Sequence, residues 1–126
     1  MHRLPPGQSL TDKFPVLHYG SVPHTNLATW NFRVFGEVAE KKLWNWEEFN
    51  QLPRAQLMLD LHCVTRWSKF DTLWEGVSVK TLVEMGMIQP KATAKFVIQH
   101  CEQGYTTNTP IDLLLSASML MATPLT

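Results

Sequence analysis

One stretch, residues 57–76, constrains the fold more than any other part of the chain. Its first half alternates two sets of side chains, with Leu57, Leu59, Leu61 and Cys63 in one set and Met58, Asp60, His62 and Val64 in the other. Because successive side chains of a strand point to opposite faces, this alternation predicts a strand that places Cys63 on the leucine face and His62 on the other. Residues 65–69 then break the alternation, which is typical of a loop that leaves a sheet and lines a pocket. We therefore expect a thiol at the end of a strand, where a loop presents it to a ligand.

Cys63 has two interpretations at this level. A free cysteine on an apolar strand face is commonly a small buried hydrophobe, and spacing alone favours that interpretation. Its neighbours favour a second one, because His62, Arg66 and Lys69 are potential positive charges close in sequence. Positive charge stabilises a thiolate, which is the form that binds soft metals or attacks electrophiles. Residue types and spacing leave both interpretations open.

The motifs around this cysteine resemble those of a known family. Residues 62–68 read HCVTRWS and residues 74–77 read WEGV, which together resemble the cysteine motif of the sulfite oxidase-like molybdopterin-dependent oxidoreductases. The resemblance extends to further segments, namely residues 3–8, 14–20, 30–38, 94–97 and 104–108. These segments match only the front part of the family's domain. The resemblance therefore implies a single, partial molybdopterin-binding domain over residues 1–126 that is C-terminally truncated.

The resemblance also implies a cofactor and its ligands. Cys63 would be the thiolate ligand of molybdenum in Mo-molybdopterin, with the remaining sulfur ligands supplied by the dithiolene of the pterin. The reaction implied is a two-electron oxygen-atom transfer on a sulfite-type or sulfoxide-type substrate. Arg66 would attract that substrate, although a solvated arginine is the commoner explanation of such a residue.

Two further segments are implied as pterin contacts. The first is the end of the N-terminal arm, with Leu17, His18 and Tyr19, and the second is the exit of a later strand, with His100 and Cys101. Simple packing residues are the alternative interpretation at each of these positions. If the implied contacts are correct, the strand ends that carry Cys63 and His100 should converge on one cleft.

The expected fold class is α+β, with a mixed sheet and short helices between the strands. Residues 1–15, rich in Pro, Gly and polar residues, are expected to form an extended arm that lies over the domain. Alternation predicts a half-buried strand over residues 30–38, and capping residues predict short helices over 46–51 and 79–85. An apolar run predicts a central strand over 94–101, followed by a turn over 104–108. A final helix is expected over residues 111–121.

Charge and composition exclude several classes of function. Eleven Lys and Arg balance eleven Asp and Glu, so nothing favours binding to nucleic acid or to an anionic membrane. No apolar run has the length of a membrane span or of a signal segment, and we expect a cytoplasmic protein. The two cysteines have no CxxC spacing, which argues against a thiol-redox protein, and the absence of a haem-attachment CxxCH suggests that a separate protein transfers the electrons.

One alternative belongs to a different class of function. A domain that keeps this fold but has lost part of the cofactor site would serve as a structural or interaction module without catalysis. The presence of further cofactor-contacting strands after residue 126 would favour the enzyme over this module.

Overall fold

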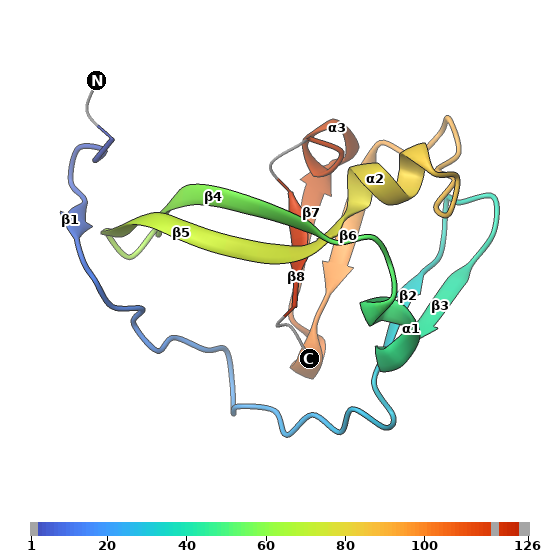
Figure 1. Cartoon of the computed structure of the whole chain (residues 1–126), viewed down its shortest axis with the longest axis horizontal. Coiled ribbons are helices and arrows are strands. Elements are labelled where there is room, and N and C mark those ends of the chain that lie inside the picture. Colours follow the sequence, from blue (N-terminus) through green and yellow to red (C-terminus); the bar gives the residue numbers. More distant parts are fainter. Residues whose placement is uncertain (1–2, 117–118, 124–126) are drawn as a thin grey trace.

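The computed structural model (Figure 1) describes residues 3–116 and 119–123. The first two residues of the expected arm and the last three residues of the expected domain therefore lie outside the described residues. The elements follow one another as β1 (Ser9–Leu10), β2 (Asn31–Val34), β3 (Lys42–Asn45), α1 (Trp46–Asn50), β4 (Ala55–His62), β5 (Trp67–Ser78), α2 (Val79–Glu84), β6 (Phe96–His100), the 3-10 turn η1 (Glu102–Gly104), β7 (Thr106–Pro110), α3 (Ile111–Leu114) and β8 (Leu120–Ala122).

The long antiparallel hairpin β4–β5 is the centre of the largest sheet. The short strand β1 pairs with the start of β5 in parallel, and β8 pairs with the end of β5 in antiparallel orientation. Figure 1 shows the hairpin as a long ribbon with β1 beside its tip and most other elements grouped around its opposite end. The sheet is therefore mixed and the helices are short, which confirms the expected α+β class.

The core lies at the base of this hairpin. Its buried side chains come from β3, from α1 and the residues that follow it, from the end of β5, and from α2 and the turn after it: Trp44, Phe49, Leu52, Val77, Leu82 and Ile88. Trp30, Phe32 and Val34 pack against them from the segment expected to be a half-buried strand. The core therefore fixes the base of β4–β5 and leaves its tip to be held by other contacts.

Local signals placed the first two helices correctly. Asn45 and Glu48 form a reciprocal capping box at the start of α1, and the Ser78 hydroxyl accepts a hydrogen bond from the Thr81 N–H at the start of α2. Gly86 has a positive φ of 77° just after α2, where a left-handed residue ends the helix. These features depend on neighbouring residues only, so the sequence alone predicts them.

The C-terminal expectations were partly wrong. Residues 106–110 form the strand β7 instead of a turn, and β7 is the one described partner of β6, so β6 is not central in its sheet. The final helix is only Ile111–Leu114, while residues 117–118 of its expected span lie outside the described residues. Residues 120–122 form β8 instead, because the end of β5 offers free backbone groups for pairing.

The surface of the chain is large for its mass. Its accessible area is 9389 Å² at 14.5 kDa, whereas a compact monomer of this mass exposes roughly 6900 Å². Part of the excess lies on the hairpin, where the cross-strand partners Met58 and Leu73 are 62% and 61% exposed. The hairpin thus carries apolar side chains on both faces, and the described residues leave this cross-strand pair uncovered.

Candidate functional site

The turn between β4 and β5 presents Cys63. The Cys63 N–H donates to the Trp67 carbonyl at 2.9 Å, and the Arg66 N–H donates to the Cys63 carbonyl at 3.1 Å. Arg66 has a φ of 71°, so the turn closes through a left-handed residue, as in three-residue hairpin loops with a bulge. Cys63 is half-buried, whereas the loop residues that follow it are exposed. The thiol therefore lies at the tip of a rigid hairpin, and the expected loop over residues 65–69 is shorter because β5 already begins at Trp67.

Hydrogen bonds around the thiol favour its charged form. The Thr65 hydroxyl donates to Cys63 Sγ at 3.2 Å. This hydroxyl, together with the backbone N–H groups of Thr65 and Val64, lowers the pKa of the Cys63 thiol below its usual range, although burial opposes the shift. Donors that point at a sulfur stabilise the thiolate over the thiol. The turn is thus built to hold a thiolate.

A buried donor lies on the same face as the thiol. Trp67 is the cross-strand neighbour of Cys63, and its indole Nε1 is buried without a hydrogen-bond partner among the described residues. Its N–H contributes to the lowered pKa of Cys63, but it does not reach the ordinary geometry of a hydrogen bond. A buried donor without a partner is costly. A polar or anionic group bound beside Cys63 would supply the acceptor that this N–H lacks.

His62 lies on the opposite face, as the alternation predicted. It pairs across the hairpin with Ser68, and its Nδ1 lies 2.7 Å from the Ser68 hydroxyl. Its ring packs edge-on against Phe70, which has the same orientation in β5. His62 therefore supports the hairpin from behind the thiol.

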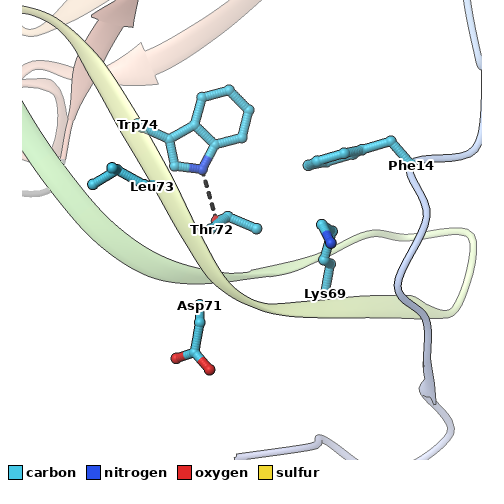
Figure 2. A pocket seen from close by; sticks show the side chains of 6 residues that line it. All are labelled: Phe14, Lys69, Asp71, Thr72, Leu73 and Trp74. Carbon is cyan, nitrogen blue, oxygen red and sulfur yellow. Dashed lines mark hydrogen bonds between the residues drawn. The ribbon is translucent and has the colours of Figure 1, made fainter.

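A cavity lies beside the turn on the Cys63 side of the hairpin. Its volume is about 330 Å³, and its lining residues are Phe14, Lys69, Asp71, Thr72, Leu73 and Trp74. Figure 2 shows Phe14 of the arm facing Trp74 and Lys69 of β5, with Asp71 pointing away from them. Phe14 also meets Trp67 edge-on at a ring separation of 5.7 Å. The cavity thus combines aromatic walls with one ammonium group on the face of the hairpin that carries the thiol.

Arg66 occupies the exposed end of the turn. No described carboxylate pairs with its guanidinium, in contrast to Arg3 and Arg54, which both form ion pairs. An unpaired guanidinium three residues after the thiol is positioned to attract an anion.

The other candidate residues lie elsewhere. The Tyr19 ring packs at a tilt against the Tyr105 ring, with the ring centroids 4.8 Å apart, and His18 Nδ1 lies 2.6 Å from the Gly20 carbonyl. His100 stacks on Phe35, and the Cys101 thiol donates to the Tyr105 carbonyl at 3.3 Å. Tyr19 thus brings the segment that follows the arm against the β6–β7 turn. Leu17 of the same segment is exposed.

These candidates do not join Cys63 in one cleft. Figure 1 shows the β6–β7 turn well apart from the hairpin tip that carries Cys63. The expected convergence of Cys63 and His100 was therefore wrong, because β6 pairs with β7 in a sheet separate from β4–β5.

Sequence reasoning missed several residues near the thiol. Gln8, Ser68 and Trp67 surround the turn, and Thr65 donates to the sulfur. Gln8 and Ser68 belong to the segments that carry the family resemblance, and this was the signal that could have identified them. Within the part of the chain that the structure describes, no three His, Cys, Asp or Glu side chains are grouped to hold a metal ion. A metal at Cys63 would take its other ligands from a bound group.

Comparison with known proteins identifies relatives. Residues 19–126 match the family described as "Oxidoreductase molybdopterin binding domain". The chain is 40% identical over 121 residues to the uncharacterized oxidoreductase YuiH of Bacillus subtilis, covering 95% of this chain and 60% of that protein. It is 28% identical over 106 residues to a putative protein-methionine-sulfoxide reductase subunit, YedZ1, of Azospira oryzae, covering 82% of this chain and 39% of that protein. The chain thus spans less than two thirds of the length of each relative. No helix among the described residues is long and apolar enough to cross a membrane.

Proposed function

Because the chain belongs to the oxidoreductase molybdopterin-binding domain family, we propose that it is the metal-binding part of a molybdenum oxidoreductase in which Cys63 is the protein's thiolate ligand. The family predicted from residues 62–68 and 74–77 is thereby confirmed. The specific role of Cys63 and the sulfite oxidase-like type of chemistry are the proposal.

The hydrogen bonding of the turn is the observation that carries this assignment. A thiolate ligand must be deprotonated to bind a metal. The Thr65 hydroxyl and two backbone N–H groups lower the pKa of Cys63, and the buried Trp67 indole N–H on the same face lacks an acceptor. Both features fit a sulfur that holds an electron-poor metal with polar ligands around it.

The cofactor and the residues around Cys63 would have separate roles. Mo-molybdopterin, when bound, would supply two-electron, oxygen-atom transfer, which is chemistry that no side chain provides. Cys63 would hold the metal at the hairpin tip, and Arg66 would attract an anionic or sulfoxide-type substrate toward it. Phe14, Trp74 and Lys69 would bound the adjacent cavity and exclude water from one side of the site.

The pterin contacts are better sought in this cavity than at the β6–β7 turn. Leu17, His18, Tyr19, His100 and Cys101 were expected to contact the pterin, but no described contact links them to the Cys63 turn. The cavity opens on the face of the hairpin that carries Cys63, and its aromatic walls suit a flat ring. We therefore propose the cavity as the place for the cofactor or the substrate.

The substrate and the electron donor follow from the relatives by analogy only. One relative is named as a methionine-sulfoxide reductase subunit. We propose a sulfite-type or sulfoxide-type substrate for this chain, with a separate protein as the electron partner. Because the chain covers only 60% and 39% of the two relatives, residues beyond these 126 would complete the activity.

Metal content after expression in a host that makes molybdopterin tests the assignment. We expect molybdenum to copurify with the protein, and Cys63→Ser to remove most of it, because a hydroxyl is a much poorer ligand for a soft metal. Cys101→Ser is the matched control, since Cys101 is the other free cysteine and is exposed on the β6–β7 turn.

Each outcome decides the question. Loss of molybdenum in Cys63→Ser alone supports the proposal. Equal molybdenum in the parent and in Cys63→Ser would refute Cys63 as the ligand. A parent protein that takes up no molybdenum even when it is joined to the remaining part of a relative's domain would favour the alternative of a structural or interaction module without catalysis.

A further inference from the structure

A line of hydrogen bonds joins the N-terminal arm to the Cys63 turn. Gln8 Nε2 donates to the Cys63 carbonyl at 3.1 Å, and Gln8 Oε1 accepts from the Ser68 hydroxyl at 3.0 Å. Ser68 Oγ is in turn 2.7 Å from His62 Nδ1. Ser68 is fully buried and Gln8 is half-buried, whereas His62 at the end of the line is exposed.

The direction of every bond in this line is determined. The Ser68 hydroxyl has one proton and gives it to Gln8, so His62 Nδ1 must carry the hydrogen that it shares with Ser68 Oγ. The Gln8 amide must then point its NH₂ at Cys63, because the reverse orientation would place two carbonyl oxygens against each other. The Cys63 carbonyl accepts from both Gln8 and the Arg66 N–H, so both of its lone pairs are used.

The backbone of the arm frames the same turn. The Ser9 N–H donates to the Arg66 carbonyl and the Thr11 N–H to the Ser68 carbonyl, each at 2.9 Å, as β1 pairs in parallel with β5. The arm therefore binds the backbone of Arg66, the last residue of the turn, and of Ser68, which follows Trp67. Internal bonds close the turn, and the arm fixes it from outside.

The arm is anchored on both sides of Gln8. The Arg3 guanidinium binds Asp60 and Asp71 at the bulge of the hairpin, at 2.6 and 2.8 Å, and lies over the Phe70 ring. Further along, Lys69 Nζ donates to the Asp12 carbonyl at 2.9 Å. Gln8 is thus held at a fixed place and is not a side chain on a free terminus.

We infer that Gln8 is a positioning residue for the Cys63 ligand, and that the N-terminal arm is the element that sets the orientation of the metal-binding turn. The inference rests on the proposed role of Cys63. Gln8 touches neither the sulfur nor the cavity, and it acts through the peptide group that carries the ligand. Groups that orient a metal ligand from behind typically alter metal affinity by about ten- to a hundredfold.

A single carbonyl signal can test the geometry without metal. Cys63–Val64 is the one Cys–Val pair in the chain, because Cys101 precedes Glu102. Protein labelled with carbonyl ¹³C in cysteine and ¹⁵N in valine therefore gives one peptide-bond NMR signal, which reports on the Cys63 carbonyl. We expect Gln8→Met and Gln8→Glu to shift this signal upfield, because neither side chain can donate to the carbonyl at neutral pH.

The two variants separate positioning from packing. Gln8→Glu keeps an acceptor for Ser68 but places a charged carboxylate oxygen against the Cys63 carbonyl, whereas Gln8→Met removes both bonds without adding a charge. A shift of the same sign in both variants is therefore assigned to the donor to Cys63 that both have lost. Gln89→Met is the matched control, because it removes a glutamine side chain whose Nε2 bonds the Gly86 carbonyl away from the turn. The control should leave the carbonyl signal in place.

Metal content supplies the second readout. In a host that makes molybdopterin, we expect molybdenum per chain to fall on the order of tenfold in both Gln8 variants and to stay at the parent level in Gln89→Met. An unmoved carbonyl signal in the Gln8 variants would overturn the inference. A moved signal with undiminished molybdenum would overturn it as well.

Failure of the proposed function can be told apart from failure of this inference. If Cys63→Ser keeps its molybdenum, the ligand assignment fails. The carbonyl signal of the metal-free protein still decides whether Gln8 holds the turn.

Discussion

Arg54 joins three elements at the base of the hairpin, and its removal should loosen the C-terminal strand. Its guanidinium binds Glu75 of β5 at 3.1 Å, and it donates to the hydroxyl and the carbonyl of Thr123 at 2.8 and 2.7 Å. A longer contact of 3.4 Å reaches Asn50 at the end of α1. Thr123 directly follows β8, so Arg54 ties the end of β8 to β5 and α1. We predict that Arg54→Met, which keeps the length and the apolar stem, destabilises the protein.

The size of the effect follows from burial. Arg54 and Glu75 are 18% and 21% exposed, so the pair is neither fully screened by water nor fully buried. Breaking a fully buried pair costs about 3–5 kcal/mol, whereas an exposed pair contributes about 0–1 kcal/mol. With Thr123 also losing two bonds to a charged group, we expect the free energy of unfolding to fall by about 2–3 kcal/mol.

Urea denaturation measures this loss. For a domain of this size, a fall of about 2–3 kcal/mol lowers the urea midpoint by about 1–2 M with an unchanged slope. Lys80→Met is the control, because Lys80 forms an exposed ion pair with Glu84 at 3.7 Å whose loss should cost less than about 0.5 kcal/mol. A loss below about 1 kcal/mol in Arg54→Met would refute the reasoning that these bonds hold β8.

Three further predictions concern the hairpin and its turn. Gly76→Ala should expel β8, because a Cβ there would lie 2.2 Å from the Met121 carbonyl oxygen, and hydrogen exchange of the β8 amides should accelerate accordingly. Arg3 lowers the pKa of Asp60 from 3.8 to about 2, so the stability from this contact is present above about pH 4 and is lost as the pH falls through about 2. Acid unfolding of Asp60→Asn should lack that component, and an identical acid profile in parent and variant would contradict the assignment. His62→Gln should lower stability or cofactor retention but keep the rate per bound molybdenum within a few-fold, whereas a fall on the order of a hundredfold would assign His62 a proton-transfer role.

The features that depend on contacts between residues close in sequence were predicted correctly. Asn45 with Glu48 and Ser78 with Thr81 cap their helices through bonds that span three residues, so their sequence spacing was sufficient. The faces of Cys63 and His62 followed from the alternation of strand side chains, because the irregularity between Leu59 and Leu61 adds its extra residue to β5 and not to β4.

Contacts between distant segments could not be predicted in this way. The parallel pairing of β1 with β5, the bond from Gln8 to Cys63 and the Arg3 contacts join residues more than fifty positions apart. The expected final helix failed for the same reason, since the free edge of β5 takes residues 120–122 into the sheet whatever their helical preference. The position of the thiol was therefore predictable, but the groups that hold it were not.

The parallel pairing of β1 with β5 has a consequence for the order of events during synthesis. Ser9 pairs beside Trp67, which is made 58 residues later, and at about 5–20 residues per second this takes roughly 3–12 s. The β4–β5 hairpin, in contrast, needs only its own residues and closes within about 1–10 μs once they are free. The arm is thus made before the hairpin, but it can pair only after β5 has been made. Until it pairs with β5, the backbone of the arm is unpaired, and the Cys63 turn forms first, without the contacts that the arm later adds.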